Sequence, residues 1–140
     1  MLMCMILRNI TGFLLGIPFV WIGYDHFVRP EIFDPIVPSY LGFPRFWTLS
    51  SGVLEILLGI GIMIPLSRRL AARLLTLFLF CVYLANLNMW LNDLPFNGNL
   101  LSSNGHLIRL LIQIVLISIT LWLAELFLGK TPRGQEEKAN

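Results

Sequence analysis

Charged side chains are scarce in this sequence. Only 13% of its 140 residues are Asp, Glu, Lys or Arg, whereas a soluble domain has about 25%. The deficit is larger in the body of the chain, because five of the 10 basic and 8 acidic residues fall within the last eleven positions. The mean hydropathy is +0.77. These features exclude an ordinary soluble enzyme and predict a protein that lies in the lipid bilayer.

Patterns typical of redox, metal and nucleic-acid sites are also missing. The two cysteines, Cys4 and Cys81, form no CxxC pair, so neither a dithiol redox centre nor a structural disulfide is expected. Two histidines and a few carboxylates without tight spacing predict no metal site. The net charge of +2 is too small and too dispersed to predict nucleic-acid binding.

Long apolar runs make up most of the chain, and one span needs roughly 20 apolar residues. The first run ends without a small-x-small cleavage site, so we interpret it as a retained span rather than a secretory signal. The predicted fold is all-α, a bundle of four transmembrane helices that forms one domain over residues 1–128. Gly129 is predicted to end the last helix, and residues 129–140 to form a short charged cytoplasmic tail. The predicted spans are residues 6–27, 46–66, 70–91 and 107–128.

The connections between these spans predict an antiparallel bundle. Four prolines between the first two spans forbid a continuous helix there and predict an ordered loop or a short helix at the membrane surface. The link from Pro65 to Arg69 is too short for anything but an antiparallel pair, and residues 92–104 form a polar loop. Seven Lys and Arg residues lie on the side of the termini and three on the opposite side. The positive-inside rule therefore predicts that both termini are cytoplasmic.

A few polar side chains interrupt the apolar spans, and such residues usually face the interior of a bundle. On helical wheels they share faces with small residues, as in the Gly12-xxx-Gly16 pattern, which permits close helix approach. The ionisable residues within the bundle all fall in its outer half, whereas the cytoplasmic half is almost wholly apolar. The candidate ligand-binding residues are His26, Glu55, Asn86, Arg109 and Gln113.

Each candidate also has a structural interpretation. Glu55 is either a ligand or proton site, or the ion-pair partner of Arg109. Arg109 could alternatively extend to the outer surface, and Asn86 and Gln113 could join helices through hydrogen bonds. His26 could be an ordinary helix-end residue at the membrane interface. No catalytic motif is readable, so no catalytic residue is predicted.

Several motifs, in this order, resemble the DoxX family of small four-helix membrane proteins. The resemblance covers residues 20–125. The sequence departs from the family at Leu84, where the family usually has proline before Ala-Asn, and this leaves the local helix break and the presentation of Asn86 open. The motifs are Gly23-Tyr24-Asp25-His26-Phe27, Pro30-Glu31, Ile36-Val37-Pro38, Ser51-Gly52-Val53-Leu54-Glu55-Ile56-Leu57-Leu58-Gly59, Arg68-Arg69, Ala85-Asn86, and Arg109 with Gln113 and Trp122.

The DoxX resemblance implies an inner-membrane protein that is a subunit or partner of a quinone-linked or redox-associated complex. The favoured function is such a subunit, with an outward-opening pocket for an amphipathic ligand such as a quinone. Glu55 and Arg109 would fix the polar end of the ligand, and Asn86, Gln113 and His26 would line the pocket. No cofactor motif is readable, so electrons would come from a membrane redox partner protein.

Other functions remain open at this point. The alternative is a non-enzymatic assembly or scaffold subunit whose polar cluster only locks the bundle. A small transporter is less favoured, because the cytoplasmic half offers no polar path. The surroundings of the chain are predicted to be the lipid bilayer, no nucleic-acid partner is expected, and a homo-oligomer is neither predicted nor excluded.

Overall fold

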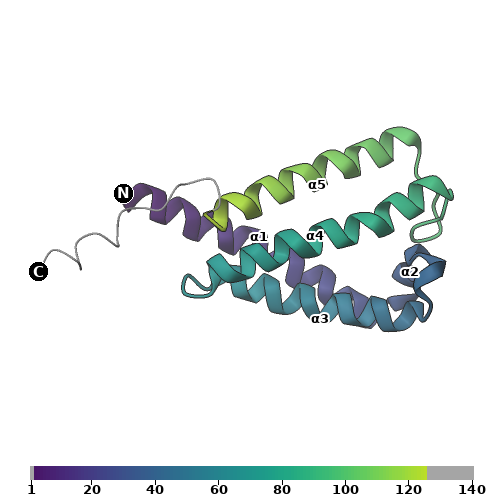
Figure 1. Cartoon of the computed structure of the whole chain (residues 1–140), viewed down its shortest axis with the longest axis horizontal. Coiled ribbons are helices and arrows are strands. Elements are labelled where there is room, and N and C mark those ends of the chain that lie inside the picture. The colour runs from purple at the N-terminus through teal and green to yellow at the C-terminus, as the bar shows by residue number, and fades with distance from the viewer. Residues whose placement is uncertain (1, 126–140) are drawn as a thin grey trace, which may run out of the picture.

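Four long helices form the body of the molecule in the computed structural model, which describes residues 2–125 (Figure 1). All four are long and apolar enough to cross a membrane. The prediction of an all-α bundle with four spans is therefore confirmed, and the chain is a multi-pass membrane protein. The long helices are α1 (Leu2–Val28), α3 (Pro44–Met63), α4 (Arg68–Leu91) and α5 (Ser103–Leu123), and the short ones are α2 (Pro30–Phe33), η1 (Asp34–Ile36) and η2 (Ser39–Leu41).

The first three predicted spans lie within four residues of the observed helix ends, but the fourth is displaced. The predicted span was 107–128, whereas α5 runs from Ser103 to Leu123. It begins earlier because Ser102 caps it, with its side chain accepting a hydrogen bond from the Gly105 amide. It ends earlier because Glu125 adopts a left-handed conformation with φ 59°, which stops helical hydrogen bonding. The helix end predicted at Gly129 and the tail at 129–140 lie outside the described residues.

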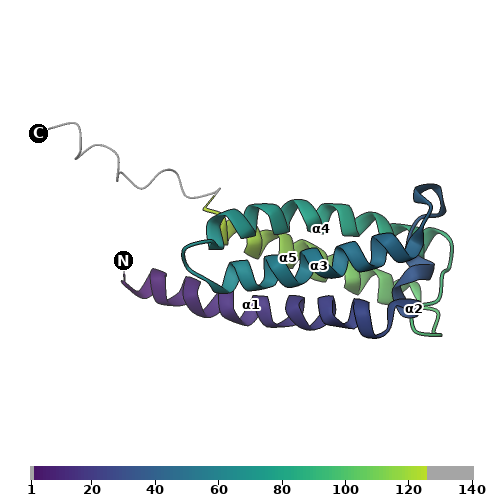
Figure 2. The same ribbon diagram turned by 90° about the horizontal axis from the view of Figure 1, so that it is seen from below.

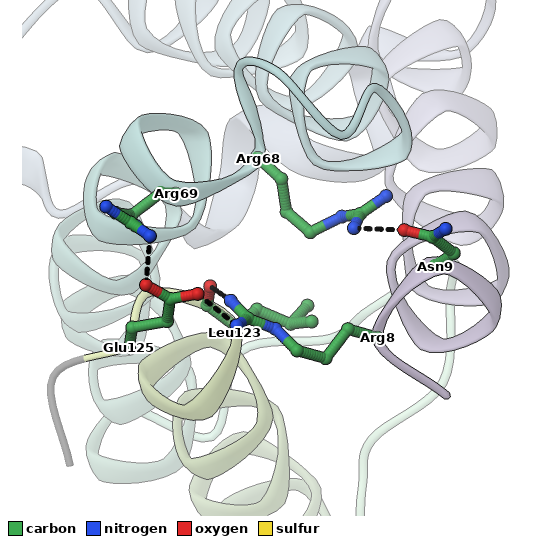
Figure 3. A network of polar contacts seen from close by, with 6 residues as sticks. All are labelled: Arg8, Asn9, Arg68, Arg69, Leu123 and Glu125. Carbon is green, nitrogen blue, oxygen red and sulfur yellow. Dashed lines mark hydrogen bonds and ion pairs between the residues drawn. The ribbon is translucent and has the colours of Figure 1, made fainter. Parts of the chain in front are cut away.

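The long helices are neighbours in the order α1, α3, α4, α5 (Figures 1 and 2). The start of α1, the turn between α3 and α4, and the end of α5 meet at one end of the bundle. We call this the arginine end, because Arg8, Arg68 and Arg69 gather there (Figure 3). The opposite end, which we call the loop end, carries α2, η1, η2 and residues 92–102. The ordered loop or short helix predicted between the first two spans is confirmed.

Glycines allow α1 and α3 to pack backbone against backbone. A Cβ added at Gly16 would lie 2.5 Å from the carbonyl oxygen of Gly59, and one added at Gly23 would lie 2.8 Å from that of Gly52. Such distances are well below van der Waals contact, so any larger residue would push the helices apart. The predicted close approach at the glycine-bearing faces is confirmed.

The packed core lies in the half of the bundle toward the arginine end. Ile62, Leu75 and Leu123, from α3, α4 and α5, are fully buried there. Thr76 and Thr120 add a buried hydrogen bond of 2.8 Å between α4 and α5. The arginine end is closed by side-chain packing, and the space left for a site begins near the middle of the bundle.

Candidate functional site

A cavity of about 910 Å³ extends from the middle of the bundle to the loop end. Ligand pockets in proteins are typically about 300–1,000 Å³ and mostly apolar, with a few convergent polar groups. The wall of this cavity is mostly apolar and is built from all four long helices and from the short segments that follow α1. All five candidate residues line it: His26, Glu55, Asn86, Arg109 and Gln113.

Glu55 lies on the buried face of α3 with only 6% of its surface exposed. Its Oε2 atom has no hydrogen-bond partner among residues 2–125. Its salt-bridge contact within the described residues is with His26, whose Nδ1 lies 3.5 Å from Oε2. That Nδ1 is 2.8 Å from the carbonyl oxygen of Ile22, which can only accept, so the Nδ1 hydrogen is directed to Ile22. Glu55 therefore presents an unsatisfied oxygen in the cavity wall.

Arg109 is held by neutral groups on α4 and the following loop. Its Nη2 donates to Asn86 Oδ1 at 2.8 Å, and Nη1 lies 3.9 Å from the sulfur of Met89. Its guanidinium carbon is 5.2 Å from the centre of the Phe96 ring, a cation–π arrangement. The side chain thus turns into the bundle rather than extending away from it.

The interpretation of Arg109 as the ion-pair partner of Glu55 is wrong. Within residues 2–125 the salt-bridge contact of Glu55 is with His26, and Arg109 makes none. The physical reason is that Asn86 and Phe96 hold the guanidinium on the α4 side of the cavity. The two residues line one cavity without neutralising each other.

Asn86 and Gln113 both take part in hydrogen bonds between α4 and α5. Gln113 Nε2 donates to the carbonyl oxygen of Leu79 at 2.6 Å, and Asn86 accepts from Arg109. The interpretation that they join helices is therefore confirmed, while both also face the cavity. Helix α4 continues unbroken through Leu84, so no local break presents Asn86.

Thr48 is a further polar residue of the cavity wall that the sequence did not single out as a site residue. It is 1% exposed, and its Oγ1 has no hydrogen-bond partner among the described residues. It stands seven residues before Glu55 on the same face of α3, two helical turns nearer the loop end. Its position on the stripe of Gly52 and Glu55 was readable, but the missing partner was not, because partners come from other helices.

Aromatic side chains cover the cavity at the loop end. The His26 and Phe33 rings stack with centres 3.8 Å apart, and Phe33 meets Phe96 edge to face at 5.8 Å. Asn88 Nδ2 donates to the carbonyl oxygen of Ile36 at 3.2 Å, which ties η1 to α4. His26 is therefore a buried part of this cover rather than an exposed helix-end residue.

A second polar cluster lies at the arginine end (Figure 3). Glu125 forms ion pairs with both Arg8 and Arg69, and Arg8 also donates to the carbonyl oxygen of Leu123 at 2.8 Å. These contacts connect α1, α4 and the end of α5. Burial tends to raise the pKa of the Glu125 carboxyl, but hydrogen bonds and charges from Arg8 and Arg69 outweigh it and hold this pKa below its ordinary value.

The described residues contain a further groove, which lacks polar groups that could hold a ligand. A groove of about 490 Å³ on the lipid-facing side of α1 and α3 is lined by apolar and aromatic residues such as Ile17, Trp21 and Ile60. No three His, Cys, Asp or Glu side chains within residues 2–125 are grouped closely enough to hold a metal ion.

Comparison with known families places most of this chain in one of them. Residues 15–124 match a family described as a domain of unknown function (DUF8561). The chain belongs to the DUF8561 family. The DUF8561 region includes the whole set of cavity residues, whereas Arg8 and Glu125 of the arginine end lie outside it. Comparisons with curated proteins and with solved structures find no match, so the DoxX resemblance stays a prediction.

Proposed function

We propose that this protein binds an amphipathic, lipid-soluble ligand such as a quinone in its cavity, and that it acts as a DoxX-like subunit or partner of a redox-linked complex in the inner membrane. The observation that supports the binding role is the cavity itself, which combines a large apolar wall with an unsatisfied carboxyl oxygen of Glu55. Buried polar groups in native proteins are nearly always hydrogen-bonded, so an exception calls for a missing partner. The quinone and the redox partner rest on the DoxX resemblance.

The proposed binding places polar groups on two sides of the ligand. Glu55 and His26 stand on the α3 and α1 side, and Arg109, Asn86 and Gln113 stand on the α4 and α5 side. The Asn86 and Gln113 side chains would hold the ligand while keeping their interhelical bonds. Electrons would have to reach a bound quinone from the partner complex.

The test is a titration of the purified full chain with a short-chain quinone analogue. Asn86→Leu and Gln113→Leu should each weaken binding about 10-fold, which corresponds to about 1.4 kcal/mol, whereas Ser118→Ala on the exposed face of α5 should not. Equal binding by all variants would refute the placement of the ligand in this cavity. Absence of saturable binding to the unmutated chain would refute the function.

A non-enzymatic assembly subunit is the second candidate function. One observation favours it: the α4–α5 hydrogen bonds of Asn86 and Gln113 hold the bundle without any ligand. In that case the two Leu variants would lower the melting temperature of the protein in detergent, and the unmutated chain would bind no quinone analogue.

We further propose that the arginine end faces the cytoplasm, as the distribution of basic residues favours. The loop end would then face outward. A single cysteine placed at exposed Ser39, with Cys4 and Cys81 replaced, should react with an impermeant maleimide on intact cells. Reaction only after the membrane is permeabilised would reverse the orientation.

A further inference from the structure

The lining of the cavity has an exposed, apolar part, which we call its mouth, mostly on the neighbouring helices α3 and α4. Eight of its lining residues are exposed, and most of these belong to α3 and α4. In a membrane-spanning bundle, exposed side chains at this depth meet lipid rather than water. The exposed lining residues of these two helices are Trp47, Leu54, Leu74, Leu77, Cys81 and Leu84.

The loop end of the cavity is, by contrast, covered. Phe33 and Phe96 pack over His26, and η1 is fastened to α4 by the bond between Asn88 and Ile36. Ile36 is itself buried. A ligand that came from water would have to displace this aromatic cover, whereas one that came from lipid would meet only exposed apolar lining residues such as Leu54 and Leu77.

One of the two cavity-wall oxygens that lack a partner among the described residues, that of Glu55, lies inside the mouth. Glu55 is the next residue after Leu54, but it points to the buried face of α3, where its Oε2 is unsatisfied. A molecule that reaches Glu55 from the lipid would therefore place an oxygen-bearing head inside and leave an apolar tail at the mouth. The carboxyl can accept from a hydroxyl of the head or, when it carries the proton, donate to a carbonyl.

We propose that the ligand is a single-tailed lipid amphiphile that enters sideways from the bilayer, with its oxygen-bearing head against Glu55 and its tail between α3 and α4. This inference rests on the proposed function and adds to it the route, the orientation of the ligand and the requirement for a tail. It makes Leu54 and Leu77 determinants of specificity for the tail, and Glu55 the contact of the head.

Photo-crosslinking of the full chain in lipid nanodiscs tests the tail position. The probe is a fully substituted benzoquinone with a ten-carbon tail that ends in a diazirine, and labelled peptides are identified by mass spectrometry with and without excess unlabelled quinone. Only labelling that the competitor removes is counted, because the diazirine also reacts with any lipid-facing surface. We expect this labelling around Leu54 in α3 and around Leu77 and Cys81 in α4.

Matched variants distinguish the contribution of the ligand's tail to binding from that of its head. Leu77→Trp should lower the binding affinity for the tailed probe by about 10-fold or more. It should leave the affinity for tailless tetramethylbenzoquinone unchanged. Leu70→Trp is the control, since Leu70 lies on the same helix with the same 63% exposure as Leu77 but outside the cavity lining. Glu55→Leu should lower the binding affinity for both the tailed and the tailless molecule, in the quinone form, the quinol form or both.

The outcomes distinguish this inference from the function on which it rests. Competed labelling on α1 or α5 alone, or equal loss of affinity in Leu77→Trp and Leu70→Trp, would overturn the route while quinone binding stood. Unchanged binding of both redox forms by Glu55→Leu would overturn the placement of the head. Failure of the unmutated chain to show any competed labelling would overturn the inference and the proposed function together.

Discussion

The polar groups at the arginine end are paired with one another, whereas some of those in the cavity are not. At the arginine end, Arg68 donates to the Ile62 carbonyl, to Asn9 and to the Met63 carbonyl, and Glu125 is shared by two arginines (Figure 3). In the cavity, Glu55 and Thr48 each carry a buried oxygen without a partner among the described residues. Complete pairing stabilises a fold, and incomplete pairing costs stability unless something else binds. The comparison therefore separates a structural clamp from a candidate ligand site.

The largest effect should follow from removing Arg68. Its guanidinium is buried and binds two carbonyl oxygens where α3 ends, so Arg68→Met leaves these acceptors and Asn9 unpaired. Losing a hydrogen bond from a charged donor costs about 1.5–3 kcal/mol. We expect the free energy of unfolding in detergent to fall by about 3 kcal/mol, since several such bonds are lost together.

The matched control is Arg73→Met, on the same helix and exposed, which should change the free energy of unfolding by no more than about 0.5 kcal/mol. Equal losses in the two variants would mean that Arg68 acts through its charge at the membrane surface. The arginine end would then no longer count as a clamp built from buried hydrogen bonds.

A smaller loss of stability is expected at low pH, because Glu125 contributes to stability through its ionised carboxyl. A carboxyl whose folded pKa is depressed contributes stability that is complete above its unfolded pKa, about 4.3, and that is lost as the pH falls through the folded pKa. The pKa of Glu125 is lowered in this way by Arg8 and Arg69, against the effect of burial. Below about pH 4 the melting temperature of the unmutated chain should therefore fall more steeply than that of Glu125→Gln.

Comparison with the Glu125→Gln curve removes every pH effect that the two proteins share. Parallel curves between pH 6 and pH 3 would show that the pairs with Arg8 and Arg69 add nothing to stability in solution, as is common for exposed pairs. Glu125 is partly exposed, with 24% of its side chain accessible, so the difference should be modest and should shrink in high salt.

Helix number and packing faces could be predicted from the sequence because they depend on local properties. The lengths of the apolar runs predicted the spans to within a few residues for α1, α3 and α4. The glycine stripe of α1 predicted a close helix approach, and the structure shows that the partner is α3. The end of α5 was missed because it depends on the conformation of Glu125, which interacts with Arg8 more than 100 positions away.

The polar residues that line the cavity could be predicted, but their pairing could not. Polar residues in apolar helices turn inward, and this alone gathered His26, Glu55 and Gln113 around one cavity. Which of them touch depends on the rotation of each helix and on the loops. Phe96 and Asn86 hold Arg109 from positions whose proximity only the tertiary structure determines.

The smallest expected effect is the energetic coupling between Glu55 and Arg109, and it tests the comparison most directly. A double-mutant cycle with Glu55→Gln and Arg109→Gln should be additive to within about 0.5 kcal/mol, because residues without a shared contact rarely couple more strongly. The same cycle with Arg8→Gln and Glu125→Gln should deviate from additivity, since those two side chains are paired directly. Unfolding in detergent measures both cycles under one set of conditions.

The outcomes decide whether the two ends differ. If the Glu55–Arg109 cycle shows coupling as large as the Arg8–Glu125 cycle, the two cavity residues interact at a distance, and Glu55 is not a free acceptor for a ligand. If both cycles are additive, the arginine end is not a clamp either. Additivity only in the cavity is the result that keeps the two ends different, because it means that Glu55 and Arg109 do not interact, whereas Arg8 and Glu125 do.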